Sequence, residues 1–224
     1  MAGLGVGAWL ALVPDRSIRV IASATIGVSL AAGLARWQLG RWFSEQPRYE
    51  VESHSGDFEV RYYAPRVQAE TVVNAAPWTT SLQQGFGRLG AYIFGKNAER
   101  RTIAMTVPVT ATVGATDRAT RSVTFKMPED CPIEELPRPD DRSITLRAIP
   151  ARRVAALRFS GNCGLALPDA KRRQLLDRAR AAGLIPIGDV VFAGYDAPST
   201  LPWLRRNEVL VEVSTLPRTP SRTT

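Results

Sequence analysis

The sequence predicts an α+β protein whose two halves have the same order of elements. Each half holds two segments in which apolar and polar residues alternate, one segment of helical period, and two further β-rich segments. Alternation with period two is typical of strands that bury one face, whereas apolar spacings of three and four are typical of helices. The order ββαββ therefore occurs twice, and we expect two antiparallel sheets, each with one helix, related by a pseudo-twofold axis.

The first half begins with a predicted hairpin. Residues 49–52 and 58–62 alternate, and a loop at 53–57 joins them through Gly56. The only histidine, His54, falls in this loop, where we expect it to be exposed. Residues 68–73 continue in extended character.

Residues 77–94 predict a helix with Pro77 in its first turn. One apolar stripe runs along it, formed by Trp78, Leu82, Phe86, Leu89 and Ile93. Three glycines also lie inside it, each costing about 1 kcal/mol relative to alanine. They are Gly85, Gly87 and Gly90.

The side of this helix away from the stripe is small and apolar. Gly87, Gly90, Ala91 and Phe94 fall there, and Arg88 is the only charged residue of the helix. One interpretation is that neighbouring elements hold the helix and tolerate the glycines. The other is a smooth face on which a flat hydrophobic ligand or another protein lies.

The stretch after this helix, residues 102–113, is rich in β-branched side chains and predicts a strand. Pro108 donates no backbone hydrogen bond, so we expect this strand to lie at an edge or to carry a bulge. A second strand is expected at 122–127, and three prolines make 131–141 a loop.

The second half repeats this order. Residues 143–148 and 153–159 predict a second hairpin, 168–182 a helix followed by Gly183, and 190–195 and 208–213 two strands. The polar residues 217–224 are expected to form a disordered tail.

The N-terminal region predicts a membrane anchor at residues 17–42. Val20–Ala35 contains sixteen residues without a charge, about 24 Å of helix. Flanking arginines and the interfacial Trp37 and Trp42 extend that reach toward a bilayer core of about 30 Å. The competing interpretation is a signal peptide, which would export the protein after cleavage. Residues 43–48 are expected to be a polar linker.

The composition argues against several function classes. The net charge is +8, but the arginines are scattered and form no basic stripe with interleaved aromatics, so we expect no nucleic-acid partner. One histidine and two cysteines, Cys131 and Cys163, are too few for a zinc site, and free thiols are favoured over a bridge. An exposed His54 also disfavours a catalytic triad, so we expect no enzyme.

Several short motifs occur in a characteristic order. They are Gly95–Asn97, Ile103–Val109, Phe125–Pro128, Ala193–Pro198 and Arg205–Val209. In this order they resemble the SOUL haem-binding protein family, over about residues 49–213. The resemblance implies a distorted antiparallel β-barrel with two helices at 49–216. It also implies non-covalent binding of haem or another porphyrin, without catalysis, in an apolar cleft beside the first helix.

The same resemblance implies a set of ligand-contacting residues, with no histidine bound to iron. The set is Gly87, Arg88, Gly90, Ala91, Phe94, Met105, Arg205 and Arg206. The last two have two interpretations, a grip on propionates or a structural ion-pair cluster, and the second is favoured. The alternative function is a protein-interaction module that uses the same helix face. An enzyme acting on a hydrophobic small molecule is the weakest hypothesis.

Overall fold

The computed structural model describes residues 44–74, 77–113, 120–162, 166–197 and 199–215. The expected anchor at 17–42, the tail at 217–224 and Cys163 lie outside these residues. No helix in the described part of the chain is long and apolar enough to cross a membrane.

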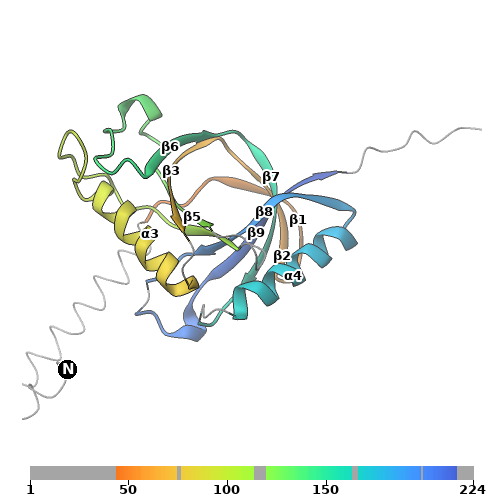
Figure 1. Ribbon diagram of the computed structural model, residues 1–224. Helices are drawn as coiled ribbons and strands as arrows, with labels where there is room; N and C mark the ends of the chain where they lie inside the picture. The colour runs from red at the N-terminus through yellow and green to blue at the C-terminus, as the bar shows by residue number, and fades with distance from the viewer. Residues whose placement is uncertain (1–43, 75–76, 114–119, 163–165, 198, 216–224) are drawn as a thin grey trace, which may run out of the picture. The chain divides into compact units, whose positions relative to one another are not determined.

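The described residues form one antiparallel sheet of nine strands with two α-helices (Figure 1). The strands are β1 (Tyr49–Ser55), β2 (Phe58–Tyr63), β3 (Arg66–Asn74), β4 (Val109–Val113), β5 (Thr120–Lys126), β6 (Ile144–Ile149), β7 (Arg152–Phe159), β8 (Leu184–Gly194) and β9 (Asn207–Thr215). The helices are α3 (Trp78–Ile93) and α4 (Ala166–Ala181), and two short 3₁₀ turns are η1 (Ile133–Glu135) and η2 (Pro202–Leu204).

The expected antiparallel α+β fold with two helices is confirmed, but the sheet is open, so the expected distorted barrel does not close. Its order is β1-β2-β7-β9-β8-β4-β5-β3-β6, with β1 at one edge and β6 at the other. From the central β8–β4 pair outward, the order is β9-β7-β2 on one side and β5-β3-β6 on the other. The repeat of the two halves is therefore real, but the halves share one sheet instead of forming two.

The observed repeat is β2-β3-α3-β4-β5 and β6-β7-α4-β8-β9, so it begins one strand later than expected and leaves β1 outside it. The first strand of each repeat pairs with a strand of the other half. β2 pairs with β7 of the second half, and β6 pairs with β3 of the first half. The hairpin of β1 and β2 is confirmed. The expected hairpin at 143–159 is wrong, because β6 and β7 leave Pro150 toward opposite halves of the sheet.

Both helices cover the same face of the sheet. Val190 and Phe192 project from one side of β8, and Val190 belongs to the core under α4 while Phe192 belongs to the core under α3. Helix α4 packs on β7, β8 and β9, and α3 packs on β3 and β5. The other face carries a third, smaller apolar cluster, which includes Val154, Ala156 and Leu210, together with polar and charged side chains.

The expected strand at 102–113 is only partly regular. β4 begins at Val109, directly after a cis Val107–Pro108 peptide bond. Before it, the buried Asn97 side chain donates to the carbonyls of Tyr92 and Arg101 at 2.9 and 2.7 Å. These bonds satisfy one carbonyl in the last turn of α3 and one in the irregular segment before β4.

The expected linker at 43–48 is partly built into the folded unit. The Val107 amide donates to the Glu45 carbonyl at 3.0 Å, and the Glu45 carboxylate accepts the buried Lys126 ammonium. The folded unit therefore begins at about Glu45.

Candidate functional site

The outer face of α3 forms one side of the candidate site. Helix α3 buries Trp78, Leu89 and Ile93 against the sheet, as the stripe predicts, and also Tyr92, which lies outside the stripe. Phe86 departs from that prediction, because 45% of it is exposed, although its ring meets Phe125 edge-on at 5.4 Å between centroids.

The three helix glycines have different surroundings. A Cβ at Gly85 would lie 2.5 Å from the side chain of Val123, so Gly85 allows the helix to approach β5 closely. A Cβ at Gly87 would have no neighbour within 4 Å, and one at Gly90 would meet only the Phe86 ring, at 3.9 Å. Packing therefore explains Gly85 but neither Gly87 nor Gly90.

A groove of about 690 Å³ lies along the open side of α3. Gly87, Arg88 and Ala91 line it from the helix, and Lys96 and Arg100 line it from the turn that follows. Asp140 and Asp141 line it from a later loop, which the Asp140 amide joins to the Lys96 carbonyl at 3.4 Å. The volume falls within the range of about 300–1,000 Å³ that is usual for small-molecule pockets.

Cations dominate the helix side of this groove. Arg100 pairs with Asp140 at 3.2 Å, an exposed pair that solvent weakens. Arg88 donates to the Val72 carbonyl at 3.1 Å, while Lys96 forms no ion pair within the described part of the chain. Hydrogen bonds from Ser143 to Asp141 lower the pKa of that carboxyl. The groove thus offers a flat small-residue floor beside one unpaired ammonium.

The remaining predicted residues near α3 lie beside the groove. Phe94 follows the last turn of the helix and is 67% exposed, and Gly90 lies one turn before it. Met105 is partly buried against the core under α3. The structure therefore brings Gly87, Arg88 and Ala91 together in the groove, and places Met105 in the packing behind the helix.

Arg205 and Arg206 do not reach this groove. Arg205 donates to the Thr200 carbonyl at 2.8 Å and to Asn162. Arg206 donates twice to the buried Glu208, at 3.1 and 2.9 Å, and its guanidinium stacks on the Tyr195 ring at 4.0 Å. Their contacts match the structural interpretation of this pair.

Glu208 is the centre of a buried charge network. Arg61 donates to both of its carboxylate oxygens, at 2.7 and 3.0 Å, and the Tyr195 hydroxyl donates to one at 3.0 Å. Burial alone would raise the pKa of Glu208, but the hydrogen bonds and charges of Arg61 and Arg206 outweigh it and hold the pKa below its ordinary value. Burial raises the pKa of Tyr195. The Glu208 carboxylate is therefore charged, and its partners within the protein, Arg61, Arg206 and Tyr195, satisfy it.

Metal-ligating side chains do not gather at the groove. His54 lies in β1, not in the expected loop, and is exposed. Cys131 is a free, partly buried thiol whose pKa burial raises. The described residues contain no group of three or more histidine, cysteine or acidic side chains that could hold a metal ion.

Sequence reasoning missed eight residues that line the groove, which are Gln83, Gln84, Tyr92, Lys96, Arg100, Asp140, Asp141 and Ile144. Lys96 and Arg100 follow α3 closely in the sequence, so their position could have predicted that they lie near the end of the helix. Asp140 and Asp141 come from a loop about 45 residues further along the chain. The Ala98 amide bonds the Arg138 carbonyl at 3.0 Å and brings that loop close, a contact that no local pattern predicts.

Comparisons with known proteins identify relatives by sequence. The chain is 30% identical to "Heme-binding protein 2" of Homo sapiens over 162 residues, covering 69% of this chain and 77% of that protein. It is 30% identical to the Mus musculus protein of the same name, over 71% of this chain and 80% of the other.

Solved structures with little sequence identity share the fold. The C-terminal domain of EcmrR matches with a TM-score of 0.55 at 11% identity, covering 75% of this chain and 99% of that chain. An uncharacterized conserved protein from Listeria innocua matches with a TM-score of 0.51 at 12% identity, covering 70% of this chain and 92% of that chain.

The family model described as "SOUL heme-binding protein" matches residues 44–212. This chain therefore belongs to the SOUL haem-binding protein family.

Proposed function

We propose that this protein binds haem or a related tetrapyrrole non-covalently in the groove along α3, without catalysing a reaction. Sequence relatives named for haem binding support the ligand class. The single structural observation that carries the site is the open floor at Gly87 in a groove of about 690 Å³.

The groove suits the chemistry of a porphyrin. Gly87 and Ala91 offer small side chains to a flat ring, and the exposed Phe86 and Phe94 offer aromatic surface beside them. Lys96 offers a positive charge to a propionate, since it has no ion-pair partner among the described residues. In this arrangement the groove walls and the charge of Lys96 hold the ring, so binding does not require a histidine ligand to the iron.

Titration of the full chain with haemin and with metal-free protoporphyrin tests this proposal. Enclosure predicts micromolar binding of both, with affinities that agree within about threefold, or about 0.7 kcal/mol. Strong binding of haemin alone would contradict enclosure and indicate an iron ligand. Failure of both, together with a protein captured specifically through the α3 face, would favour the interaction module.

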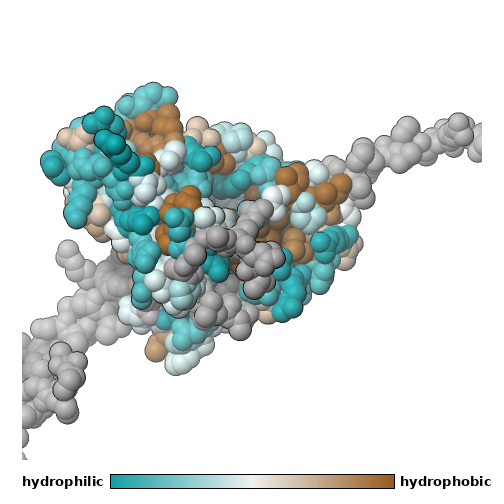
Figure 2. Space-filling model, in the orientation of Figure 1, coloured by the Kyte–Doolittle hydropathy of each residue, from teal (hydrophilic) through white to brown (hydrophobic). Residues whose placement is uncertain are grey.

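The surface gives that alternative less support. Figure 2 shows apolar side chains, on the face that it presents, in separate patches between polar ones. Large contiguous apolar patches are the usual mark of protein-docking surfaces. The open glycine floor suits a thin planar ligand better than a side chain of a partner.

We also propose that residues 17–42 anchor the protein in a membrane. The support is the uncharged run Val20–Ala35 with arginines and tryptophans at its ends.

A further inference from the structure

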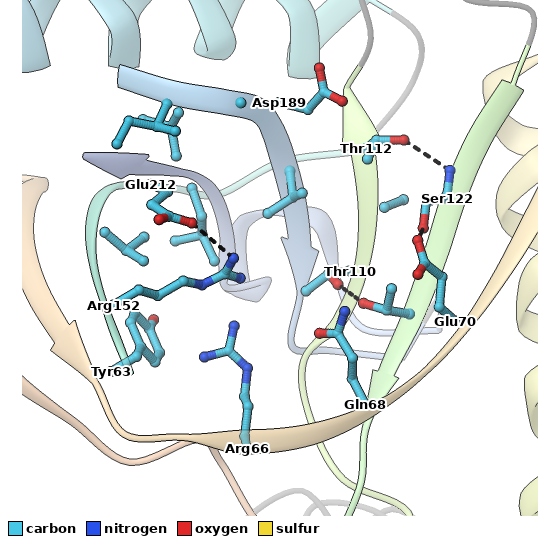
Figure 3. Close-up of a pocket in the computed structure, with 18 residues that line it drawn as sticks. Tyr63, Arg66, Gln68, Glu70, Thr110, Thr112, Ser122, Arg152, Asp189 and Glu212 are labelled. Atoms are coloured by element: carbon cyan, nitrogen blue, oxygen red, sulfur yellow. Dashed lines mark hydrogen bonds and ion pairs between the residues drawn. The ribbon is translucent and has the colours of Figure 1, made fainter. Parts of the chain in front are cut away.

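A second hollow lies on the face of the sheet opposite to the helices. It encloses about 280 Å³ and is lined from seven strands, β2 to β5 and β7 to β9 (Figure 3). Strand alternation separates it from the α3 groove: Ala69 of β3 faces the core under α3, whereas its neighbours Gln68 and Glu70 face this cavity.

Two arginines project into this cavity side by side. Arg66 begins β3, Arg152 begins β7, and Figure 3 shows their guanidinium groups directed toward each other. Like charges held together in a partly enclosed space repel, and each is costly to bury without a counter-charge. Burial and the neighbouring Arg152 lower the pKa of Arg66 to about 10.

The carboxylates around the cavity are already engaged. Glu212 pairs with Arg152 at 3.2 Å. Glu70 pairs with Arg147 at 2.6 Å and accepts the Ser122 hydroxyl, and Asp189 also has an interaction of its own. None of these carboxylates pairs with Arg66 in the described part of the chain.

The unused hydrogen-bond donors point to a missing acceptor. Arg66 Nη1 and Arg152 Nε are buried and have no acceptor among the described residues. The Arg66 guanidinium lies over the face of the Tyr63 ring, at 5.1 Å, which offers it no hydrogen-bond acceptor oxygen. Buried donors are nearly always paired in native proteins, so two orphan guanidinium donors in one cavity are unusual.

We propose that this cavity binds the oxyanion head group of a small polar molecule, a carboxylate or a phosphate, between Arg66 and Arg152. Guanidinium forks match the oxygens of both groups, and an anion would supply the missing acceptors and relieve the repulsion. Gln68 and the hydroxyls of Thr110 and Thr124 line the same space for polar groups of the rest of the molecule. The volume of about 280 Å³ lies at the lower end of the range of about 300–1,000 Å³ that is usual for small-molecule pockets, and so suits a ligand smaller than a macrocycle.

Calorimetric titration of the full chain with inorganic phosphate and with acetate, at ionic strength held constant with sodium chloride, tests the proposal. We expect saturable binding of at least one anion with a Kd below about 10 mM, and at least tenfold weaker binding in Arg66→Met. The two probes separate the head groups, since a phosphate site and a carboxylate site rank them oppositely.

Arg153→Met is the matched control. Arg153 is adjacent to Arg152 in β7 but pairs with Glu52 on the other face, so its removal lowers the net charge equally and should leave anion affinity unchanged. Equal losses in the Arg66 and Arg153 variants, or no saturable binding of either anion by the parent, would overturn the proposal. Should Arg66→Met fail to fold, Arg152→Met provides the same test, because its partner Glu212 is 39% exposed and tolerates losing it.

The proposed anion site is separate from the tetrapyrrole groove, so a failure of this proposal can be distinguished from a failure of the proposed tetrapyrrole binding. Arg66→Met should bind haemin as the parent does, within about threefold. Displacement of bound phosphate by haemin would show that both occupy one site, and would overturn the assignment of two sites.

Discussion

Arg61 and Glu208 form a bidentate ion pair beneath the sheet, with side chains that are 2% and 0% exposed. They lie 147 residues apart in the chain and join β2 to β9, two strands that both pair with β7. Glu208→Gln leaves Arg61 and Arg206 without their shared buried carboxylate, while Arg61 keeps the half-buried Glu59. We expect a loss of about 3 kcal/mol in unfolding free energy, because removing one partner of a buried pair leaves the other charge buried and uncompensated.

Chemical denaturation of parent and Glu208→Gln measures this loss. Glu52→Gln, which breaks the exposed pair with Arg153, is the control and should cost less than about 1 kcal/mol. The folded-state pKa of Glu208 lies below the ordinary value of 4.5. Its stabilisation is therefore present above that pH and lost as pH falls through the folded-state pKa, so the difference between parent and variant should shrink below pH 4.5. A constant difference down to pH 3 would contradict this role of the charge.

Gly85→Ala and Gly87→Ala should change stability in opposite directions. The new Cβ at Gly85 would overlap Val123, so α3 must move from the sheet at a cost of about 1–3 kcal/mol. At Gly87 the Cβ meets nothing, and the better helix propensity should stabilise the protein by up to about 1 kcal/mol. Thermal unfolding of the two variants side by side measures the contrast. Similar effects at both positions would mean that α3 does not pack on β5 as described.

A leucine on the open side of α3 should fill the tetrapyrrole groove. Gly87→Leu is expected to keep the melting temperature and to weaken porphyrin binding at least tenfold, about 1.4 kcal/mol. Gly90→Leu is the comparison within the helix: Gly90 is buried beside the Phe86 ring and does not line the groove, so it should weaken porphyrin binding less than Gly87→Leu does. Ala181→Leu, at an exposed position of α4, is the control and should bind as the parent does. Parent-like haemin titrations for both glycine variants would place the ligand elsewhere.

Removal of the only histidine should leave haem binding almost intact. His54 is exposed on the edge strand β1 and is not among the residues that line the α3 groove. We therefore expect His54→Ala to change haemin affinity less than threefold, or about 0.7 kcal/mol. Absorption titration of the Soret band measures it. A tenfold weaker affinity or a lost Soret shift would show that His54 binds iron.

Membrane attachment should depend on the N-terminal residues. The full chain should sediment with membranes and resist carbonate extraction, because Val20–Ala35 carries no charge. A fragment that starts at residue 44 keeps Glu45 and its contacts with Val107 and Lys126, and should remain in the supernatant. Sequencing of the mature N-terminus decides between anchor and signal peptide, since a start beyond residue 30 would contradict an uncleaved anchor.

Much of the fold follows from local patterns in the chain. Alternation identified the hairpin of β1 and β2, and the apolar stripe identified α3, because both depend on which face of a segment is buried. The motif order, from Gly95–Asn97 to Arg205–Val209, identified the family, which the comparisons confirm. The open side of α3 was also visible, since Gly87 and Ala91 have a fixed angular place on any helix.

Tertiary structure decided what local pattern cannot contain. The hairpin expected at 143–159 does not form, because β6 pairs with β3 at one edge of the sheet while β7 pairs with β2 and β9 in the other half. Arg61 meets Glu208, and Asp140 meets Arg100, only because strands and loops distant in sequence come together. Arg66 and Arg152 carry no local signal at all, since their shared cavity exists only where the sheet curves. Sequence period determines which face is buried, while pairing across the sheet determines which charges share a cavity and which of them lack a partner.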